Sequence, residues 1–392
     1  FFSFSLFFGI FEFIRGSILT GFPWNLIAYS FSNHLEILSI TSFIGTYGFN
    51  LFCISLFASP AVFILRDTKK DIGVCIIFLM MPLLFYMYGL SYKQTFSTSD
   101  VVSYNYKVRA IGSNISLERF YSNTDPVLVI KDLIEISEPI KNEKTIFVWP
   151  EGILPEISQK ELFEYKWLFE KRFDKNHLLL IGINNQTTNK ESINYFNSLS
   201  IYDHNLELLN FYNKVDLVPF GEFLPFEDKL KALGLRSITN NYQSFSKGNR
   251  REIMEINREG FSIKILPLIC YEIIYSGKIF SNSNFDLIIN ISEDGWFGKS
   301  IGPKQHFAHS IFRAVESGKY LLRSANNGIA AIINPLGIVE QKIEYGESGF
   351  IDFKEAKKIQ PTLFSKYGNK IFIILILLYI FIIFSFNRTK NE

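Results

Sequence analysis

Long runs of apolar residues without charged side chains constrain this chain more than any other feature. Ile37–Leu65 contains only uncharged residues, and Ile72–Leu90 has about the 20 residues that a membrane-spanning helix needs. A third run, Ile371–Phe386, is slightly shorter, but Lys370 and Arg388 at its ends can reach the membrane interface. Core helices of a soluble protein are a poor explanation for three such runs, so we expect the chain to cross a membrane.

The chain begins at Phe1, inside an apolar run, rather than at a methionine. We therefore expect Phe1–Ile14 to be the remainder of a further span, with other spans preceding it in a longer protein. Glu12 lies in this run, and a carboxylate at membrane depth needs a partner or a polar cavity. The predicted organisation is a helical membrane region over residues 1–92, a globular domain over 100–356 and a C-terminal membrane helix over 368–387.

Basic residues in short segments predict the orientation. Arg66–Asp71 ("RDTKKD") lies between two apolar runs, and "NRTKNE" follows the last one. Lysine and arginine concentrate on the cytoplasmic side of membrane proteins. Placing both segments there sends the region from about Ser91 to Lys370 to the extracytoplasmic side.

The middle region, Val101–Phe353, alternates short β-rich runs with segments whose apolar residues have helical spacing, such as Pro126–Lys141 and Gln305–Gly318. This alternation predicts an α/β domain whose sheets are covered by helices. Ser292–Pro303 ("SEDGWFGKSIGP") is expected to be a long loop. The net charge of +2 argues against bulk attraction to nucleic acid.

Three ends of predicted strands carry side chains that can do chemistry. "TIFVWPEG" ends in Glu151, "FYNKVDLVPFGEFLP" contains Lys214 and then Glu222, and "LPLICYE" ends in Cys270. Taken alone, such residues are usually solvated acids and bases or inert thiols. However, the other two cysteines lie in the proposed spans, so Cys270 has no disulfide partner in the outer domain. An unpaired thiol outside the cytoplasm is a liability unless it has a use.

A thiol nucleophile needs a proton acceptor, because the thiolate is the reactive species. A carboxylate can serve if burial raises its pKa, and a cation near the reacting carbonyl can stabilise the oxyanion. Glu151, Lys214 and Cys270 supply these three groups. A metal site is disfavoured, because the histidines form no ligand-spaced cluster with the single outer cysteine and no HExxH or CxxC occurs. No cofactor is expected.

The order "WPEG", "YNKVDLVPFGEFLP" and "ICYE" resembles the nitrilase superfamily, whose members use a Glu–Lys–Cys triad. Three further segments, "GFPWNLIAYS", "ISEDGWFGKSIGPKQH" and "RSANNGIAAIINPLG", together with the apolar runs, resemble the apolipoprotein N-acyltransferase family of bacterial lipoprotein maturation. The resemblance covers nearly the whole chain and lacks only the family's first membrane helices. It implies a nitrilase-like αββα sandwich, of α/β class, inserted between transmembrane helices.

The resemblance implies a ping-pong acyl transfer in the bacterial inner membrane, with the catalytic domain on the periplasmic face. The donor is a phospholipid, typically phosphatidylethanolamine, whose sn-1 acyl group would form a thioester with the cysteine. The acceptor is the α-amino group of the diacylglyceryl-cysteine at the N-terminus of an apolipoprotein. Both partners are lipids, so the site is expected to lie against the membrane.

The resemblance also implies residue roles. Glu151 matches the general base, Lys214 the lysine that stabilises the oxyanion, and Cys270 the nucleophile. Four residues are expected to support them: Glu222 by orienting Lys214 or the amine, Glu272 similarly, Tyr271 through its backbone N–H, and Asn197 as an asparagine near the site. Tyr121, Trp296 and Phe297 are expected to face lipid or substrate, and Val218–Leu235 to form an interfacial arm.

Two positions depart from the family pattern. Tyr121 stands where the family commonly carries tryptophan, and Lys231 where it carries arginine, which leaves the acyl-chain and headgroup preferences open. Two other functions are also considered. A membrane-tethered amidohydrolase would use the same triad with water as the acceptor, and an inactive membrane scaffold would have lost one of the three residues. All three are present.

Overall fold

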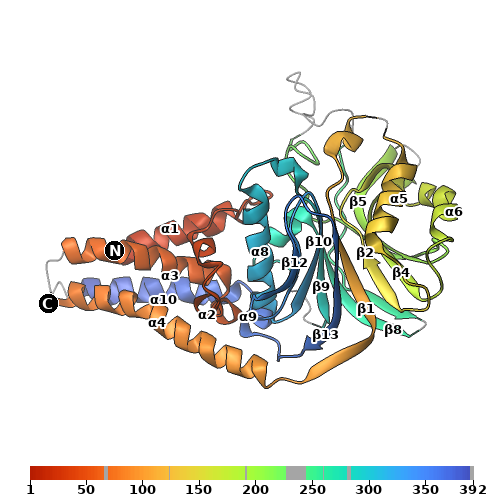
Figure 1. The fold of residues 1–392 in the computed structure, drawn as a ribbon. Coiled ribbons are helices and arrows are strands. Elements are labelled where there is room, and N and C mark those ends of the chain that lie inside the picture. The colour runs from red at the N-terminus through yellow and green to blue at the C-terminus, as the bar shows by residue number, and fades with distance from the viewer. Residues whose placement is uncertain are drawn as a thin grey trace.

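The computed structural model describes residues 1–65, 69–122, 124–189, 192–226, 244–258, 260–279 and 284–388. Figure 1 shows two parts, a bundle of long helices and an α/β domain from which the bundle projects. Both ends of the chain lie in the bundle, away from the sheets.

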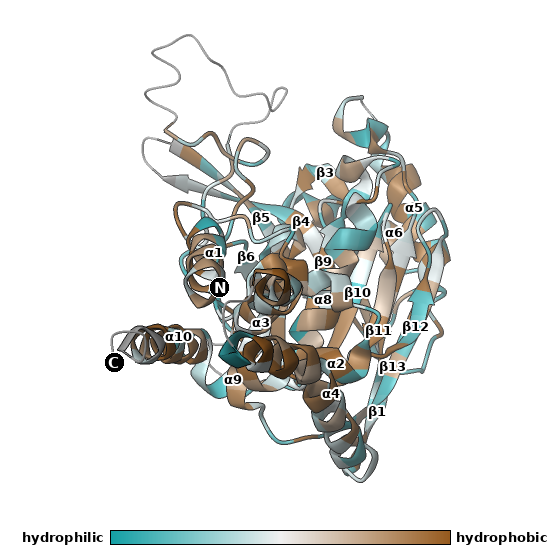
Figure 2. Ribbon diagram, turned by 90° about the vertical axis from the view of Figure 1, so that its left-hand side faces the viewer, coloured by the Kyte–Doolittle hydropathy of each residue, from teal (hydrophilic) through white to brown (hydrophobic). Residues whose placement is uncertain are grey.

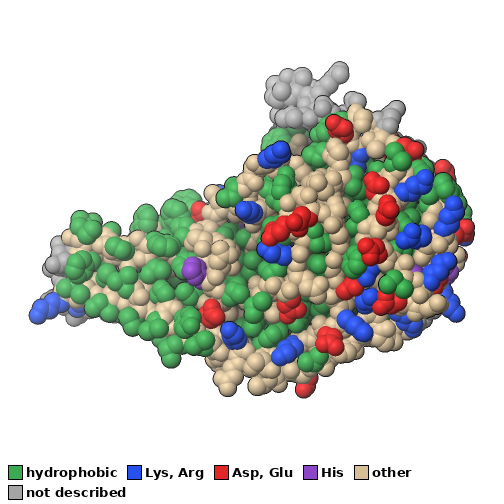
Figure 3. Space-filling model, in the orientation of Figure 1, with side chains coloured by type: hydrophobic (Ala, Val, Ile, Leu, Met, Phe, Trp, Pro, Cys, Tyr) green, Lys and Arg blue, Asp and Glu red, His purple; other side chains and the backbone are tan. Residues whose placement is uncertain are grey.

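The bundle contains α1 (Phe2–Arg15), α3 (Thr41–Ile64), α4 (Lys69–Ser97) and α10 (Lys370–Arg388). Helices α3 and α4 are long and apolar enough to cross a membrane, and α10 contains a shorter apolar stretch, Lys370–Ser385. Figure 2 looks along the bundle and shows its apolar residues, and Figure 3 shows that charged side chains gather instead on the α/β domain. Large apolar side chains point outward from the bundle, which fits a lipid environment.

Two expectations about the bundle can be compared with the structure. Glu12 does have a partner, because it forms an ion pair with Arg15 one turn later on α1. The expected span within Ile37–Leu65 corresponds to α3, which is long and apolar enough to cross a membrane, but the run does not form one continuous helix. The short helix α2 ends at Leu38, α3 begins at Thr41, and Gly45 interrupts α3 with φ of 71°.

In the described residues, the α/β domain is built on thirteen strands, which form one sheet in two halves. The order of the first half is β6-β5-β4-β2-β1 and that of the second is β10-β9-β8-β7, and the two halves join where β1 pairs with β10. The strands are β1 (Val101–Ser113), β2 (Thr145–Val148), β3 (Leu154–Ser158), β4 (His177–Asn189), β5 (Ser192–Asp203), β6 (Leu208–Asn213), β7 (Met254–Arg258), β8 (Phe261–Ile269), β9 (Leu287–Glu293), β10 (Tyr320–Asn326), β11 (Ala330–Ile333), β12 (Val339–Ile343) and β13 (Gly349–Lys357).

Alternation along β2 explains the layers. Ile146 and Val148 point into the core between the two halves of the sheet, whereas Phe147 and Trp149 pack in a second core beneath the outer helices. Those outer helices are α5 (Pro126–Ser137) and α6 (Lys166–Phe169) on the first half, and α8 (Gly302–Ser317) covers the second half (Figure 1). The domain is therefore the predicted αββα sandwich attached to apolar helices.

Sequence signals mark the helix ends. Asp125 caps α5 by accepting a hydrogen bond from the backbone of Val127, and Gly318 ends α8 in the left-handed conformation. The long loop expected over Ser292–Pro303 is shorter than predicted. Its first residues complete β9, the 3₁₀ helix η5 (Asp294–Phe297) follows, and α8 begins at Gly302.

Strand direction decides where the candidate residues meet. Strands β1, β2 and β4 are parallel, and β6 has the same direction because it lies two antiparallel steps from β4. Strands β8, β9 and β10 are parallel to one another and to β1. The carboxyl ends of β2, β6 and β8 therefore lie at one edge of the sandwich.

Candidate active site

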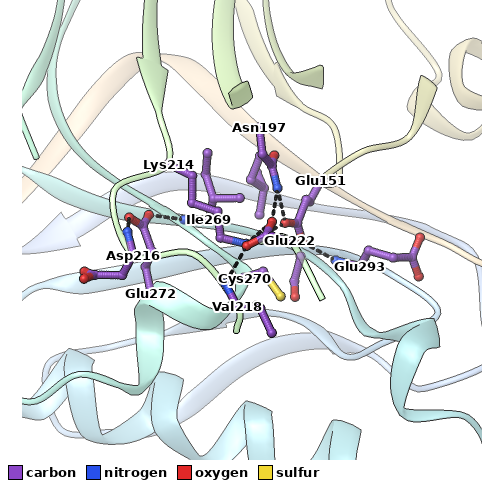
Figure 4. A network of polar contacts seen from close by, with 12 residues as sticks. Glu151, Asn197, Lys214, Asp216, Val218, Glu222, Ile269, Cys270, Glu272 and Glu293 are labelled. Atoms are coloured by element: carbon purple, nitrogen blue, oxygen red, sulfur yellow. Dashed lines mark hydrogen bonds and ion pairs between the residues drawn. The ribbon is translucent and has the colours of Figure 1, made fainter. Parts of the chain in front are cut away.

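Glu151, Lys214 and Cys270 line a single cavity of about 500 Å³ at this edge. Each follows the end of its strand: Lys214 and Cys270 directly follow β6 and β8, and Glu151 follows β2 after Trp149 and Pro150. Figure 4 shows the three side chains converging, with the Cys270 sulfur beside the polar cluster. Convergence of strand ends thus brings together residues that are 63 and 56 positions apart in the chain.

A buried lysine is held between two carboxylates. The Lys214 Nζ lies 3.1 Å from Glu151 Oε1 and 2.8 Å from Glu222 Oε1. Burial alone would lower the pKa of Lys214, but the two carboxylates outweigh it and raise that pKa well above its ordinary value. The ammonium therefore stays charged although its side chain is buried.

Asn197 connects the same carboxylates from β5. Its Nδ2 donates to Glu151 Oε1 at 2.7 Å and to Glu222 Oε1 at 2.8 Å. Its backbone carbonyl accepts from the Lys214 backbone N–H at 2.8 Å, so the sheet itself sets the asparagine beside the lysine. Both donor hydrogens of the amide are consequently used to fix the two acids.

The second oxygen of each acid is also held. Glu151 Oε2 accepts from the Glu293 backbone N–H at 2.9 Å, and Glu222 Oε2 accepts from the Val218 backbone N–H at 2.8 Å. The Glu151 side chain is 7% exposed and that of Glu222 is 13% exposed. Buried carboxylates with this many donors have fixed orientations, which suits proton transfer to and from a neighbouring group.

Cys270 has a backbone conformation that L-residues rarely adopt. Its φ is 47°, at the start of the 3₁₀ helix η4 (Cys270–Ile274). Such a conformation costs on the order of 1–3 kcal/mol and is typical of functional turns. Burial, followed by the Glu151 carboxylate, raises the pKa of the thiol well above its ordinary value, while Lys214 and Ser292 lower it. The resting thiol is therefore protonated at neutral pH.

Glu272 lies outside the cavity and organises the backbone around it. One oxygen accepts from the Ile269 backbone N–H at 2.8 Å, and the other accepts from the Val215 backbone N–H at 2.8 Å. It also forms an ion pair with Arg251 at 3.0 Å. A single buried carboxylate thus ties the residue before Cys270 to the residue after Lys214.

Tyr271 lines the cavity and donates its hydroxyl hydrogen to the carbonyl of Gly21 at 2.7 Å. Its ring stacks with Phe22 at 6.4 Å between centroids. The residue after the cysteine is therefore in contact with the segment that follows α1.

Aromatic side chains form much of the cavity wall. Trp296 is 52% exposed and Tyr121 is 64% exposed, and their rings meet edge to face. Phe297 instead turns inward against Trp24, with 5.3 Å between ring centroids. In the predicted interfacial arm, Val218–Leu235, the structure describes residues up to Phe226. Phe220 and Phe226 are exposed there, and Lys229 and Lys231 lie outside the described residues.

Two groups of site residues were not predicted. Phe22 and Trp24, from the segment after α1, contribute to the cavity wall. Asp294 forms a fully buried network with Arg323 at 2.8 Å and His306 at 2.9 Å. Asp294 follows an apolar strand as Glu151 does, and this position at a strand end could have identified it as a candidate site residue. Trp24 lies too far away in sequence to be placed.

The Asp294 network contacts the backbone of Cys270 through His306. The His306 Nε2 lies 3.2 Å from the Cys270 carbonyl oxygen. Burial alone would raise the pKa of Asp294, but Arg323 and His306 hold it well below its ordinary range. Among the described residues, no group of three histidine, cysteine or acidic side chains is arranged to hold a metal ion.

Comparisons with known proteins identify the families to which this chain is similar. A family described as "Carbon-nitrogen hydrolase" matches residues 129–352, and a family described as "Apolipoprotein N-acyltransferase N-terminal domain" matches residues 1–59. An apolipoprotein N-acyltransferase from Rickettsia bellii is 33% identical over 392 residues, covering 97% of this chain and 75% of the relative. One from Bradyrhizobium diazoefficiens is 30% identical, covering 91% and 68%.

Among solved structures, Saccharomyces cerevisiae Nit3, a member of the nitrilase superfamily, is similar over 64% of this chain and 90% of its own. The TM-score is 0.43 and the sequence identity is 14%.

Proposed function

This chain belongs to the apolipoprotein N-acyltransferase family, a family of membrane enzymes that N-acylate lipoproteins, and we propose that it does so through a thioester on Cys270. The observation that carries the proposal is the shared cavity, in which a thiol, a buried carboxylate and a charged lysine lie beside one another under an aromatic rim. A membrane lipid supplies the acyl group. We propose phosphatidylethanolamine as that lipid, with transfer from its sn-1 position.

In the first half-reaction, the Cys270 sulfur attacks the ester carbonyl carbon while Glu151 takes the thiol proton. Negative charge then develops on the carbonyl oxygen, where the Lys214 ammonium and the Tyr271 backbone N–H would stabilise it. The first turn of a helix leaves N–H groups without partners inside the helix, which favours this role for Tyr271. The carbon–oxygen bond breaks, Glu151 returns the proton to the departing oxygen, and a lysophospholipid leaves.

In the second half-reaction, the α-amino group of the diacylglyceryl-cysteine attacks the thioester. Glu151 takes a proton from the amine, and the carbon–sulfur bond breaks to give the amide and a thiolate, to which Glu151 returns the proton. Glu222 keeps Lys214 in place through its 2.8 Å contact and presents a second acid near the incoming amine. The cycle consumes no water and needs no cofactor.

The setting of the cavity supports a lipid substrate. Its wall includes Phe22 and Trp24, which lie between the bundle helices α1 and α3, and the rim includes exposed Phe220 and Trp296. Exposed aromatic residues of this kind favour membrane interfaces. We propose that the chain lies in the bacterial inner membrane as a multi-pass protein, with its cavity against the outer leaflet on the periplasmic side.

Intact-protein mass spectrometry tests the proposed intermediate. The purified full-length enzyme is mixed with phosphatidylethanolamine and no acceptor, and we expect one added fatty-acyl mass. The adduct should disappear on addition of a diacylglyceryl peptide, and Cys270→Ser should not form the labile thioester. Fatty acid release without an adduct would favour a hydrolase with water as acceptor, and no reaction at all would favour a scaffold.

Trp296 offers a test of the lipid-facing wall. Because this side chain is half exposed at the rim of the cavity, Trp296→Ala should raise KM for the phospholipid severalfold and leave kcat within about two-fold. Tyr345→Ala, at a similarly exposed aromatic residue that does not line the cavity, is the matched control. An unchanged KM for donors of every chain length would contradict the assignment.

A further inference from the structure

The segment that carries Cys270 is attached to the membrane bundle rather than only to its own sheet. Tyr275, one residue beyond η4, donates its hydroxyl hydrogen to the carbonyl of Thr20 at 2.6 Å. Ser276 accepts at its carbonyl from Asn369 Nδ2, at the start of α10, at 2.9 Å. The nucleophile segment therefore lies at the junction of the two parts of the molecule.

The break in α3 creates an unusual demand at this junction. Gly45 has φ of 71°, and a Cβ added to it would lie 2.0 Å from the ring of Phe364. Both features require glycine here. The interruption leaves Thr46 at the start of a new helical segment, where its backbone N–H has no partner inside the helix. In an apolar bundle such a donor is costly unless another group accepts from it.

Glu316 of α8 accepts from this unpaired N–H and also binds the segment that carries Cys270. Its Oε1 accepts from the Thr46 backbone N–H at 2.7 Å and from the Thr46 hydroxyl at 2.6 Å. The same oxygen accepts from the Ser276 hydroxyl at 2.6 Å. All three residues are at most 3% exposed. One carboxylate oxygen thus joins the broken membrane helix to the chain that follows Cys270.

Arg313, one turn earlier on α8, repeats the connection. It donates to the Thr46 hydroxyl oxygen at 2.6 Å and to the carbonyl of Ile274, the last residue of η4, at 3.3 Å. Its Nε lies 2.9 Å from Glu316 Oε2, so the two buried charges balance. Because Thr46 both donates to Glu316 and accepts from Arg313, its hydroxyl is placed by two partners.

We propose that Glu316 and Thr46 are positioning residues that transmit the position of α3 to the Cys270 thiol. A shift of α3 at its Gly45 break moves Glu316, because Glu316 accepts from Thr46. Glu316 also holds Ser276, so η4 moves with it. The thiol is aligned with Glu151 only while this connection is intact. The proposal rests on the proposed function in one respect, which is that Cys270 is the nucleophile.

The test uses substitutions that remove single hydroxyl groups. Thr46→Val keeps the shape and the backbone N–H of the residue but loses the hydroxyl. Ser276→Ala loses the hydroxyl that donates to Glu316 from the nucleophile segment. Thr46→Ser keeps a hydroxyl and should therefore retain function. Ser55→Ala is the matched control, because it removes an equally buried α3 hydroxyl that bonds only within the bundle, at 2.8 Å from the Tyr379 hydroxyl.

Two measurements are made on the full chain in detergent. The rate of Cys270 alkylation by iodoacetamide, followed by mass spectrometry of the cysteine peptide, reports thiol alignment without any lipid substrate. We expect Thr46→Val and Ser276→Ala to lower this rate at pH 7 by on the order of ten-fold and to shift its pH profile upward. We expect kcat for acyl transfer to fall similarly while KM stays within two-fold.

Failure of the proposal and failure of the proposed function give different results. Unchanged alkylation in both variants, or an equal decrease in Ser55→Ala, would overturn the positioning role. Normal alkylation behaviour with no acyl adduct in the wild type would instead overturn the acyl-transfer proposal. If Thr46→Val does not fold, Ser276→Ala decides the question, because it removes one bond outside the membrane helices.

Discussion

Glu151→Gln is expected to lower kcat for acyl transfer by about 10³-fold while the folded structure persists. The thiol of Cys270 is protonated at neutral pH, because burial and then the Glu151 carboxylate raise its pKa. Attack on an ester therefore requires a group that accepts the proton as the carbon–sulfur bond forms. The substitution removes one contribution to the raised pKa, but burial, the larger one, remains, so the variant thiol stays protonated.

The pH dependence of Cys270 alkylation separates loss of the base from loss of alignment. In the variant, the rate should rise about ten-fold per pH unit through the alkaline range, because the thiolate forms only by direct ionisation. The wild-type rate should be higher at neutral pH and depend on pH less steeply. Glu156→Gln, the same change at an exposed residue, is the control. A variant that keeps more than a tenth of wild-type kcat would exclude Glu151 as the general base.

The substitution is nearly isosteric, but it changes one contact. Glu151 Oε1 receives the Lys214 and Asn197 hydrogen bonds, which an amide oxygen can still accept. Oε2 receives the Glu293 backbone N–H, and an amide nitrogen there would face another donor. This mismatch costs about 1–3 kcal/mol of stability. A thermal unfolding curve should therefore accompany the kinetics.

The residues that meet at the cavity could be predicted from strand ends, because an apolar run that stops at an acid, a lysine or a lone thiol is a local signal. Glu151, Lys214 and Cys270 carry that signal, and parallel strands then bring them to one edge. The two halves of the sheet make the convergence possible, but the order in which their strands pair depends on packing over the whole domain. Sequence periodicity does not encode that order.

Other features depend on contacts that have no local signature. Trp24 reaches the cavity across the junction between bundle and domain, so its role follows from tertiary packing. The apolar run around Gly45 looks like an uninterrupted span, because glycine occurs in continuous membrane helices as well. The break is accommodated by tertiary contacts, because the Phe364 ring packs against Gly45 and the Glu316 carboxylate accepts from the Thr46 backbone N–H. The end of β9 was expected to be part of a loop, but Glu293 at that end and Asp294, which follows it in η5, are buried in ion pairs that local sequence does not reveal.

Lys214→Met is expected to lower kcat for acyl transfer by about 10³-fold and to destabilise the protein as well. The wild-type ammonium has a pKa raised well above its ordinary value of 10.5, so its stabilising contribution is complete below that value and is lost only as pH rises through the folded-state pKa. The substitution therefore removes the whole contribution at neutral pH. Breaking a buried charge pair in this way typically costs about 3–5 kcal/mol.

The lost stability of the variant has a second source. Glu151 and Glu222 both accept from Asn197 Nδ2, and without the lysine their two charges face each other with no cation between them. Like charges this close repel each other. The free energy of unfolding of Lys214→Met, measured at neutral pH, should therefore fall further than the loss of one ion pair alone requires. A stability equal to that of the wild type would show that the lysine does not hold the two acids together.

The double variant Lys214→Met/Glu222→Gln distinguishes the two roles of the lysine. Removing the Glu222 charge leaves one carboxylate in the cluster, so the repulsion disappears and the free energy of unfolding should recover much of its loss. The oxyanion would still lack its cation, so kcat should stay about 10³-fold below wild type. Both quantities are read from one preparation by thermal unfolding and acyl-transfer kinetics. Recovery of stability together with activity would show that Lys214 acts only by neutralising the acids and would assign the oxyanion to backbone donors such as Tyr271.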